Sequence, residues 1–426
     1  MKLQPVAAKK NAIFLLMAES GTKLLSLFAF AAMARGLSEQ SYGVVALAFS
    51  VGSLFYIFFN LGLEQHIVRD AKRLLCSDDH VGLQKLFATV VTIKVWLLPI
   101  SLLALFVVFT LMRWELAHLP VLYGIFLYFY FLSATQLLFF FFRAFEQMRY
   151  ELVFRTLQAG IVLGIAVVFG YVFPSVRLLA FCYAGAAGVV LLSALTFFLR
   201  KTDLIFQLRR GFHSEEVSLV GKVRYLFFIG VATSIFSGVD TFVISKVQDV
   251  AAVGVYRNAV MMTFALFLFP TAIVQAFFPR LVQPLDQLDI FFHTVKQLLV
   301  RLVPLGVVVA GACYLIAPIF IPWFFGARYA ATVPFFQVSL FAFLFATVNQ
   351  VFGYGMIALG RYRPYFLITL VVSIVSVVLN LILIPRIGLW GGIFSLNVTH
   401  ALLVLLPLGY LYALRVRVTT EGNTPL

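Results

Sequence analysis

The chain has 426 residues, of which 62% are hydrophobic and only 12% are charged. Soluble domains carry about a quarter of their residues as charged side chains, so this composition excludes an ordinary soluble protein and indicates a polytopic membrane protein. The formal net charge of +15 would suit a nucleic-acid partner. The basic residues flank long apolar runs, however, which explains the charge without nucleic acid.

The first apolar run, FLLMAESGTKLLSLFAFAAMA at residues 14–34, is too long for the apolar region of a secretory signal peptide. Glu19 and Lys23 also interrupt it, so we interpret it as a first membrane span that is retained. About 20 mostly apolar residues cross a bilayer as a helix, and this criterion predicts an all-α membrane protein with about twelve transmembrane helices. The predicted spans are 13–33, 43–63, 86–111, 120–142, 153–173, 178–199, 225–245, 253–275, 298–318, 334–357, 366–385 and 392–413.

Lysines and arginines are concentrated on alternate sides of these spans. Lys9, Lys72 and Arg149 lie on the richer side, whereas the other side holds isolated residues such as Arg35 and Arg113. The positive-inside rule then predicts that both termini lie in the cytoplasm. We expect a six-helix lobe at 1–199, a cytoplasmic linker at 200–224, a second six-helix lobe at 225–414 and a cytoplasmic tail at 415–426.

A weak internal repeat indicates that the two lobes are similar. Residues about 211 positions apart match at equivalent span boundaries. The matches are Arg35 with Lys246, Gly43 with Gly254, Arg69 with Arg280, Arg149 and Tyr150 with Arg361 and Tyr362, and Pro174 with Pro385. Because six spans per lobe is an even number, the lobes would share one orientation, related by an axis along the membrane normal.

An ionisable residue near the bilayer centre costs at least about 2.5–3.5 kcal/mol, so it must face protein or a wet cavity. Glu19 and Lys23 are four residues apart, which suits an ion pair on one helix. Two interpretations stay open. Either the pair satisfies its own charges, or Lys23 faces a cavity while Glu19 tunes it or carries a coupling proton. Asp240 is the second ion-coupling candidate, and pairing with Arg257 would also explain it.

Further polar residues within the spans are candidates for binding a substrate. Lys94 has no acidic neighbour on its own helix and either lines a cavity or pairs across helices, whereas Arg301 can snorkel to a cytoplasmic end. Asn380, Asn397 and His400 belong to polar stripes that also occur as contacts between helices. The substrate-binding candidates are Lys23, Lys94, Arg257, Arg301, Asn380, Asn397 and His400.

No catalytic constellation stands out in the sequence. It has no GxxxxGK[ST] loop for ATP, no paired carboxylates of a glycosyltransferase, and no large outer loop such as polymerases and ligases carry. Cys76, Cys182 and Cys313 are scattered without the spacing of a metal site or a disulfide framework. We expect no enzymatic activity, no cofactor and no metal.

The stretch ARGLSEQSYGVVALAFSVGSLFYIFFNLGLEQHIVRD at 34–70 resembles the opening of Wzx-type polysaccharide flippases, members of the multidrug/oligosaccharidyl-lipid/polysaccharide exporter superfamily. FGARYAATVPFF, GYGMIALGRYRPY and LIPRIGLWGGIFS follow in the order of the family, so the resemblance covers nearly the whole chain. It implies a MATE-like fold of two six-helix lobes around a central cavity.

The resemblance also implies a function. Flippases of this type move oligosaccharide units on polyprenyl diphosphate from the cytoplasmic to the outer leaflet of a bacterial inner membrane, for surface polysaccharides such as the O-antigen of lipopolysaccharide. H+ or Na+ would be the coupling ion, and a polysaccharide polymerase is a candidate partner beside the membrane lipids. Lys23, Lys94 and Arg301 would offset the diphosphate charge. The alternative is an ion-coupled drug or cation antiporter of the same fold, which would need unpaired carboxylates in its cavity.

Overall fold

The computed structural model describes residues 8–60, 63–112, 115–202, 204–207, 214–282 and 288–421. All regular secondary structure in these ranges is helical, which confirms the predicted fold class. The chain divides into two compact units, Met1–Ser234 and Ile235–Leu426. Residues 203 and 208–213 of the predicted linker and residues 422–426 of the predicted tail lie outside the described residues.

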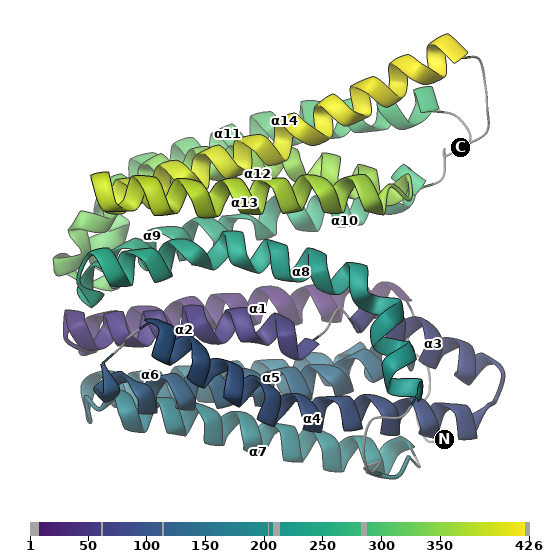
Figure 1. Ribbon diagram of the computed structural model, residues 1–426, viewed down its shortest axis with the longest axis horizontal. Coiled ribbons are helices and arrows are strands. Elements are labelled where there is room, and N and C mark those ends of the chain that lie inside the picture. Colours follow the sequence, from purple (N-terminus) through teal and green to yellow (C-terminus); the bar gives the residue numbers. More distant parts are fainter. Residues whose placement is uncertain are drawn as a thin grey trace. The chain divides into compact units, whose positions relative to one another are not determined.

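The helices of the first unit run alongside one another in Figure 1. They are α1 (Ala8–Gly36), α2 (Glu39–Asn60), α3 (Glu64–Cys76), α4 (His80–Met112), the 3-10 helix η1 (Leu116–His118), α5 (Leu119–Ala144), α6 (Met148–Tyr171) and α7 (Val176–Thr202). The boundary between the units falls within the next helix, α8 (Ser214–Val247).

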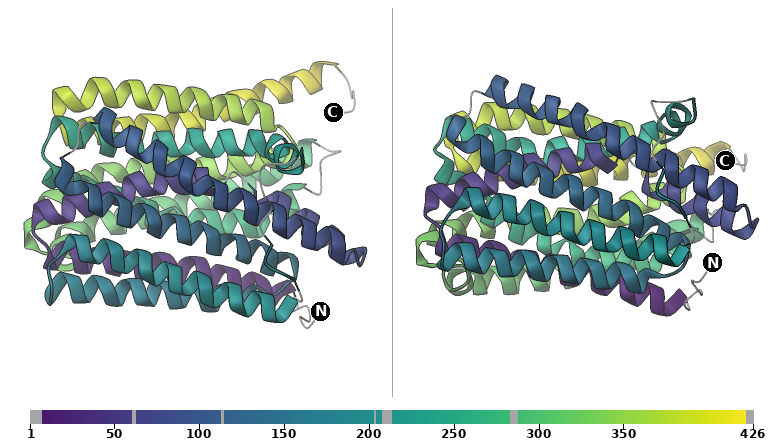
Figure 2. Two further views of the ribbon diagram at one scale, coloured as in Figure 1. Left: turned by 60° about the horizontal axis from the view of Figure 1, so that its bottom comes forward. Right: turned by 90° about the horizontal axis from the view of Figure 1, so that it is seen from below.

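The second unit continues with six more α-helices and one 3-10 helix within the described residues. They are α9 (Val250–Leu266), α10 (Leu268–Val282), α11 (Leu288–Phe325), η2 (Ala327–Ala331), α12 (Thr332–Ala358), α13 (Tyr362–Ile387) and α14 (Leu389–Glu421). Figure 2 shows from two further directions that most helices within each unit run side by side, whereas the start of α8 crosses them.

The predicted spans coincide with helices throughout the chain. Within the described ranges, eleven segments are long and apolar enough to cross a membrane, and α8 covers the remaining prediction at 225–245. The predicted span at 253–275 corresponds to the apolar segment Val250–Thr271, which a turn at Phe267 divides into α9 and α10. Pro270 explains the break, since it lacks the N–H that would bond the carbonyl four residues earlier.

The amphipathic helix α3 is a further element, in a segment that we expected to be a connection. Leu63, Ile67 and Ala71 are buried in the core of the first unit, whereas Arg69 and Lys72 are exposed. This pattern of one apolar and one basic face is typical of a helix that lies at the membrane surface.

The helix boundaries repeat along the chain as the sequence repeat predicts. Helix α2 begins at Glu39 and α9 begins at Val250, 211 residues later. Helix α1 ends at Gly36 and α8 ends at Val247, again 211 residues later. The break between α2 and α3 likewise recurs as the break between α9 and α10, so each half is built from the same series of helices.

Hydrogen bonds at the helix ends fix which ends meet in the first unit. The Asn11 side chain donates to the carbonyl of Glu146 at 2.9 Å and accepts from the amide of Met148 at 3.3 Å. Gln84 of α4 bonds both backbone groups of Ile205, at 2.7 and 2.9 Å, just beyond α7. The starts of α1 and α6 therefore meet the end of α5, so both helices run antiparallel to α5. The start of α4 likewise meets the end of α7, so these two helices are antiparallel.

Helices α1 and α6 approach each other closely enough to require glycine. A Cβ atom added to Gly36 would lie 2.0 Å from the carbonyl oxygen of Gly170, and one added to Gly170 would lie 2.9 Å from the carbonyl oxygen of Ala32. Because backbone atoms form both obstacles, no side-chain rotation can relieve the clash. Small residues allow such close contacts between membrane helices.

We therefore expect Gly36→Ala to destabilise the protein by about 1–3 kcal/mol, the usual cost of overpacking. Gly160→Ala on α6 is the matched control, because no atom lies within 4 Å of its added Cβ. Thermal unfolding in detergent should show a lower midpoint for Gly36→Ala and an unchanged or higher midpoint for Gly160→Ala. Equal midpoints for the two variants would contradict the close contact.

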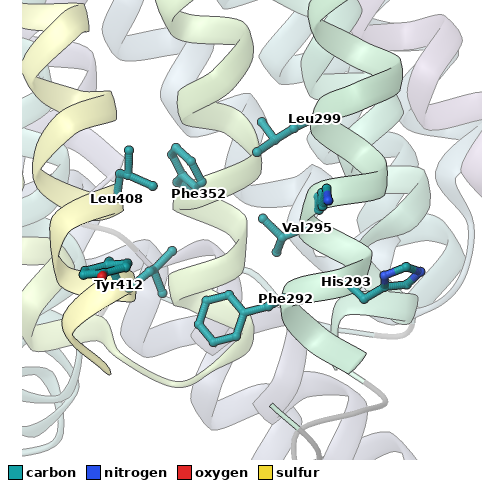
Figure 3. A pocket seen from close by; sticks show the side chains of 9 residues that line it. Phe292, His293, Val295, Leu299, Phe352, Leu408 and Tyr412 are labelled. Atoms are coloured by element: carbon teal, nitrogen blue, oxygen red, sulfur yellow. The ribbon is translucent and has the colours of Figure 1, made fainter. Parts of the chain in front are cut away.

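The second unit has its own apolar core around Val274, Phe291, Leu302, Val351 and Met356. A pocket of about 440 Å³ opens beside this core, where α11 begins and α14 ends (Figure 3). The pocket is formed entirely within this unit, by residues of α11, α12 and α14.

Candidate functional site

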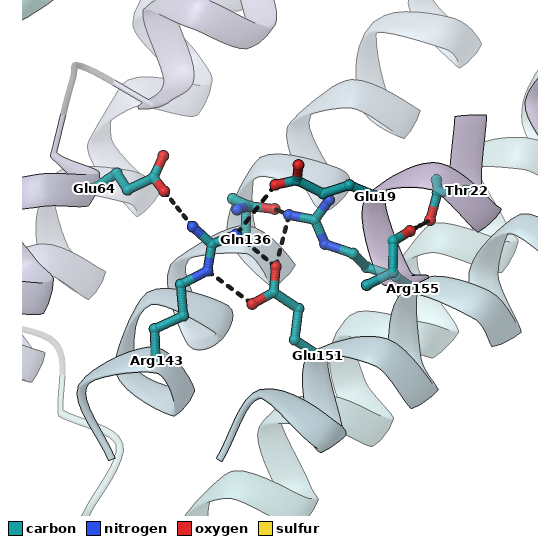
Figure 4. A network of polar contacts seen from close by, with 8 residues as sticks. Glu19, Thr22, Glu64, Gln136, Arg143, Glu151 and Arg155 are labelled. Atoms are coloured by element: carbon teal, nitrogen blue, oxygen red, sulfur yellow. Dashed lines mark hydrogen bonds and ion pairs between the residues drawn. The ribbon is translucent and has the colours of Figure 1, made fainter. Parts of the chain in front are cut away.

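A network of charged side chains joins four helices of the first unit, and we call it the arginine–carboxylate network (Figure 4). Arg143 of α5 holds Glu151 of α6 through two bonds, Nε to Oε2 at 2.8 Å and Nη2 to Oε1 at 2.7 Å. Arg155 Nη2 lies 2.8 Å from Glu151 Oε1 and donates to Gln136 Oε1, also at 2.8 Å. Arg143 also pairs with Glu64 at the start of α3.

The centre of the network is dry, whereas its edge is open. Glu151 is fully buried, and the side chains of Arg143 and Arg155 are 11% and 18% exposed. Glu19 and Glu64 keep 38% and 48% of their side chains exposed. Both guanidinium groups also lie over aromatic rings, Arg143 over Phe140 and Arg155 over Phe139. The network thus binds Arg143 through all the contacts given above, whereas the buried Nε of Arg155 lacks a hydrogen-bond partner among the described residues.

Glu19 and Lys23 lie at the open edge of this network. Glu19 Oε1 is 3.9 Å from Arg143 Nη2, so the partner of Glu19 in the structure is an arginine of another helix. Lys23 is exposed and interacts electrostatically with Glu19 and Arg155. Asn11 contacts the turn between α5 and α6, and Glu19 follows it eight positions later on α1. At 1.5 Å per residue, Glu19 lies about 12 Å further along the helix than this turn.

Removing the central carboxylate should destabilise the first unit strongly. Glu151→Gln leaves two buried guanidinium groups without their shared anion, and breaking a buried ion pair in this way costs about 3–5 kcal/mol. Glu146→Gln is the control, because Glu146 forms an exposed pair with Lys72 that is worth about 0–1 kcal/mol. Thermal unfolding in detergent measures both changes. A Glu151→Gln protein as stable as the control would contradict this account of the network.

Lys94 occupies a second polar site, inside the first unit, which we call the Lys94 site. Its ammonium donates to the carbonyl of Phe59 at 2.5 Å, to Asn60 Oδ1 at 3.2 Å and to Ser133 Oγ. Tyr130 donates to the Lys94 carbonyl at 3.0 Å. Lys94 is only 4% exposed, so its charge is satisfied by oxygen atoms at the end of α2 and on α5.

This geometry predicts a structural effect of Lys94→Ala. The change removes the ammonium from the Phe59 carbonyl and from Ser133 Oγ, whereas Asn60 Oδ1 keeps the Ser133 hydroxyl as a donor at 2.7 Å. Each buried group left unsatisfied costs about 1–3 kcal/mol. We expect a clear loss of thermal stability, whereas Lys10→Ala, which changes an exposed lysine of α1, should change stability by less than about 0.5 kcal/mol. Similar unfolding midpoints for the two variants would show that the ammonium is not held as described.

Asp240 and Arg257 are neighbours in the second unit, but Asp240 has a different closest partner. Tyr256 donates to Asp240 Oδ2 at 2.5 Å, and the amide of Thr241 donates to Oδ1 at 2.6 Å. Asp240 is 3% exposed, so it is held inside the protein. The Nε of the half-buried Arg257 is itself buried and lacks a hydrogen-bond partner among the described residues.

The other predicted binding residues differ in their surroundings. Asn380 donates to the Ser376 carbonyl at 2.9 Å within α13, and Asn397 of α14 donates to the Val338 carbonyl of α12 at 3.2 Å. His400 is buried, with Nδ1 2.9 Å from the Leu396 carbonyl. Asn380, Asn397 and His400 therefore bond helix backbones, whereas Arg301 is exposed on α11. Their predicted roles toward a substrate stay predictions.

Several members of the network were not among the predicted site residues, namely Glu64, Gln136, Arg143, Glu151 and Arg155. One signal was available in the sequence, because Glu151 and Arg155 are four residues apart with the acid first, the favourable order on a helix. Nothing in the sequence brings Glu64 to Arg143, since that contact depends on how α3 packs against α5. No cluster of metal-ligating side chains occurs within the described ranges.

Comparison with solved structures identifies the class of fold. The lipid II flippase MurJ in an inward closed conformation is similar with a TM-score of 0.76 and 12% identity, covering 94% of this chain and 87% of that one. An inward-facing multidrug resistance MATE family transporter of the MOP superfamily is similar with a TM-score of 0.70 and 14% identity. The match covers 96% of this chain and 100% of that one. A MOP superfamily transporter from Pyrococcus furiosus is similar with a TM-score of 0.58 and 12% identity, and the match covers 95% of each chain.

The protein thus has the fold of the exporters that include MATE transporters and MurJ, as the resemblance implied. A sequence model described as "Polysaccharide biosynthesis protein" matches residues 8–284, more than half of the chain, and the chain belongs to this family. Comparison with curated protein sequences gives no match.

Proposed function

We propose that this protein translocates oligosaccharide units linked to polyprenyl diphosphate from the cytoplasmic to the outer leaflet of a bacterial inner membrane. The observation that carries the proposal is the match of residues 8–284 to the polysaccharide biosynthesis family, on a fold shared with a lipid II flippase. Two units built from the same series of helices are compatible with transport by alternating access.

The distribution of charge supports an anionic substrate over a cationic one. Glu19 and Glu151 are both held by Arg143, and Asp240 is held by Tyr256. A cation antiporter would need a carboxylate that is not already paired. Lys23 and Arg301, in contrast, are exposed cations on helices that cross the membrane. Lys23 is our first candidate for contact with the diphosphate. Glu19 is our candidate for coupling to H+ or Na+, because its contact with Arg143 is long, at 3.9 Å, and its side chain is 38% exposed.

Reconstitution in liposomes with a labelled polyprenyl-diphosphate oligosaccharide tests the proposal. Transfer of the label between leaflets should be faster with the protein than in empty liposomes, and a gradient of H+ or of Na+ should identify the coupling ion. Absence of protein-dependent transfer, together with protein-dependent efflux of cationic dyes, would favour the antiporter alternative. Formation of a longer glycan by the purified protein would instead revive the polymerase or ligase alternative.

Lys23→Gln tests the contact with the diphosphate. A hydrogen bond to a charged group is worth about 1.5–3 kcal/mol, so its loss should slow transfer by about tenfold or more while thermal stability stays unchanged. Lys10→Gln is the matched control, because Lys10 is an exposed lysine about 20 Å away on the same helix. Equal transfer rates for the two variants would remove Lys23 from the proposed site.

A further inference from the structure

The pocket of the second unit has apolar walls and a polar rim. Three helices contribute its walls. The wall residues are Phe292, Val295 and Leu299 of α11, Phe352 of α12, and Leu408 and Leu411 of α14. His293, Lys296 and Tyr412 complete the lining. Phe292, Val295, Leu299, Phe352 and Leu408 project from three sides of the pocket in Figure 3. A volume of about 440 Å³ lies in the range of pockets that bind small molecules.

The surface around the pocket belongs to α11 and α14, two helices long and apolar enough to span a membrane. Val300 of α11 and Leu405 of α14 are 64% and 59% exposed, and Leu408 at the pocket itself is 45% exposed. Large aliphatic side chains exposed on helices of this length and hydropathy contact lipid chains in a bilayer. We therefore expect the pocket to open toward lipid, where a hydrocarbon chain is the solute that reaches it most readily.

The rim has the composition of a membrane interface. Lys296 and His293 are exposed, and His293 Nε2 lies 2.9 Å from Gln297 Nε2. Tyr412 is 68% exposed at the same end of the unit, and tyrosine is enriched at the level of lipid headgroups. Among the described residues that line the pocket, none is a carboxylate, so the charge that these residues offer to a ligand is positive.

We propose that this pocket binds one anionic phospholipid of the surrounding leaflet. One acyl chain enters between Phe292, Leu299 and Leu408, and the phosphate lies at Lys296 within reach of Tyr412. Basic pockets between transmembrane helices recognise anionic headgroups through this combination of charge and apolar depth. A zwitterionic lipid would fill the same pocket but gain less from Lys296. The site is separate from the proposed transport function, because its residues are not among those proposed to contact the transported lipid.

Native mass spectrometry of the full chain in nanodiscs tests the proposal. The discs contain phosphatidylcholine alone or with phosphatidylglycerol at one part in five. The protein should retain phosphatidylglycerol in preference to phosphatidylcholine. Lys296→Gln should lower retention of phosphatidylglycerol by about fivefold, which corresponds to about 1 kcal/mol per basic residue. Arg363→Gln is the matched control, because Arg363 is exposed at the start of α13 and does not line the pocket.

A second pair of variants tests the apolar part of the site. Leu408→Trp fills the pocket and should lower retention of both lipids, whereas Leu405→Trp changes an exposed position outside the pocket and should not. Thermal unfolding of each variant in detergent shows that it is folded. Equal retention of phosphatidylglycerol by the wild type and Lys296→Gln would overturn the proposal. So would co-purification of a polyprenyl phosphate at this pocket in place of a phospholipid.

Discussion

The buried carboxylate of Glu151, held between two guanidinium groups, is the interaction on which the first unit depends. Arg143 bonds Glu151 at two atoms and reaches toward Glu19 as well, so one guanidinium joins α5 to α6 and α1. In a membrane no water is available to replace a missing partner, and each charge must be satisfied by another part of the protein. The network therefore fixes how these helices meet, and it confines the exposed charges to its edge.

Two classes of polar residue can be separated by their partners. Lys94 and Asp240 are almost fully buried and have their bonding capacity filled by neighbouring oxygen or hydroxyl groups, which makes them part of the framework. Lys23 and Arg301 are exposed on membrane-spanning helices and have charge to offer to a ligand. The anionic substrate that we propose would find its counter-charges in this second class.

Hydropathy and basic flanks were sufficient to predict the helices, because the length of an apolar run is a property of the local sequence. They missed the break at Phe267, because the sequence around Pro270 stays apolar. They also missed the helix α3, because its apolar residues are spaced three or four apart and do not form a continuous apolar run. The candidate site was less predictable. The sequence left two roles open for Glu19 beside Lys23, and neither involved Arg143 of α5, which is more than a hundred residues away in the sequence and 3.9 Å from Glu19 in the structure. Contacts of this kind depend on how helices pack, which hydropathy does not encode.

The ammonium of Lys94 occupies a group of oxygen atoms, from Phe59, Asn60 and Ser133, of the kind that could coordinate a dissolved metal cation. In this protein the cation is the ammonium group of Lys94, which is covalently attached to α4. It is present once in every molecule and cannot diffuse away, so the occupancy of this position is independent of the salt content on either side of the membrane. The end of α2 consequently keeps its anchor whether the metal-salt concentrations on the two sides are equal or different.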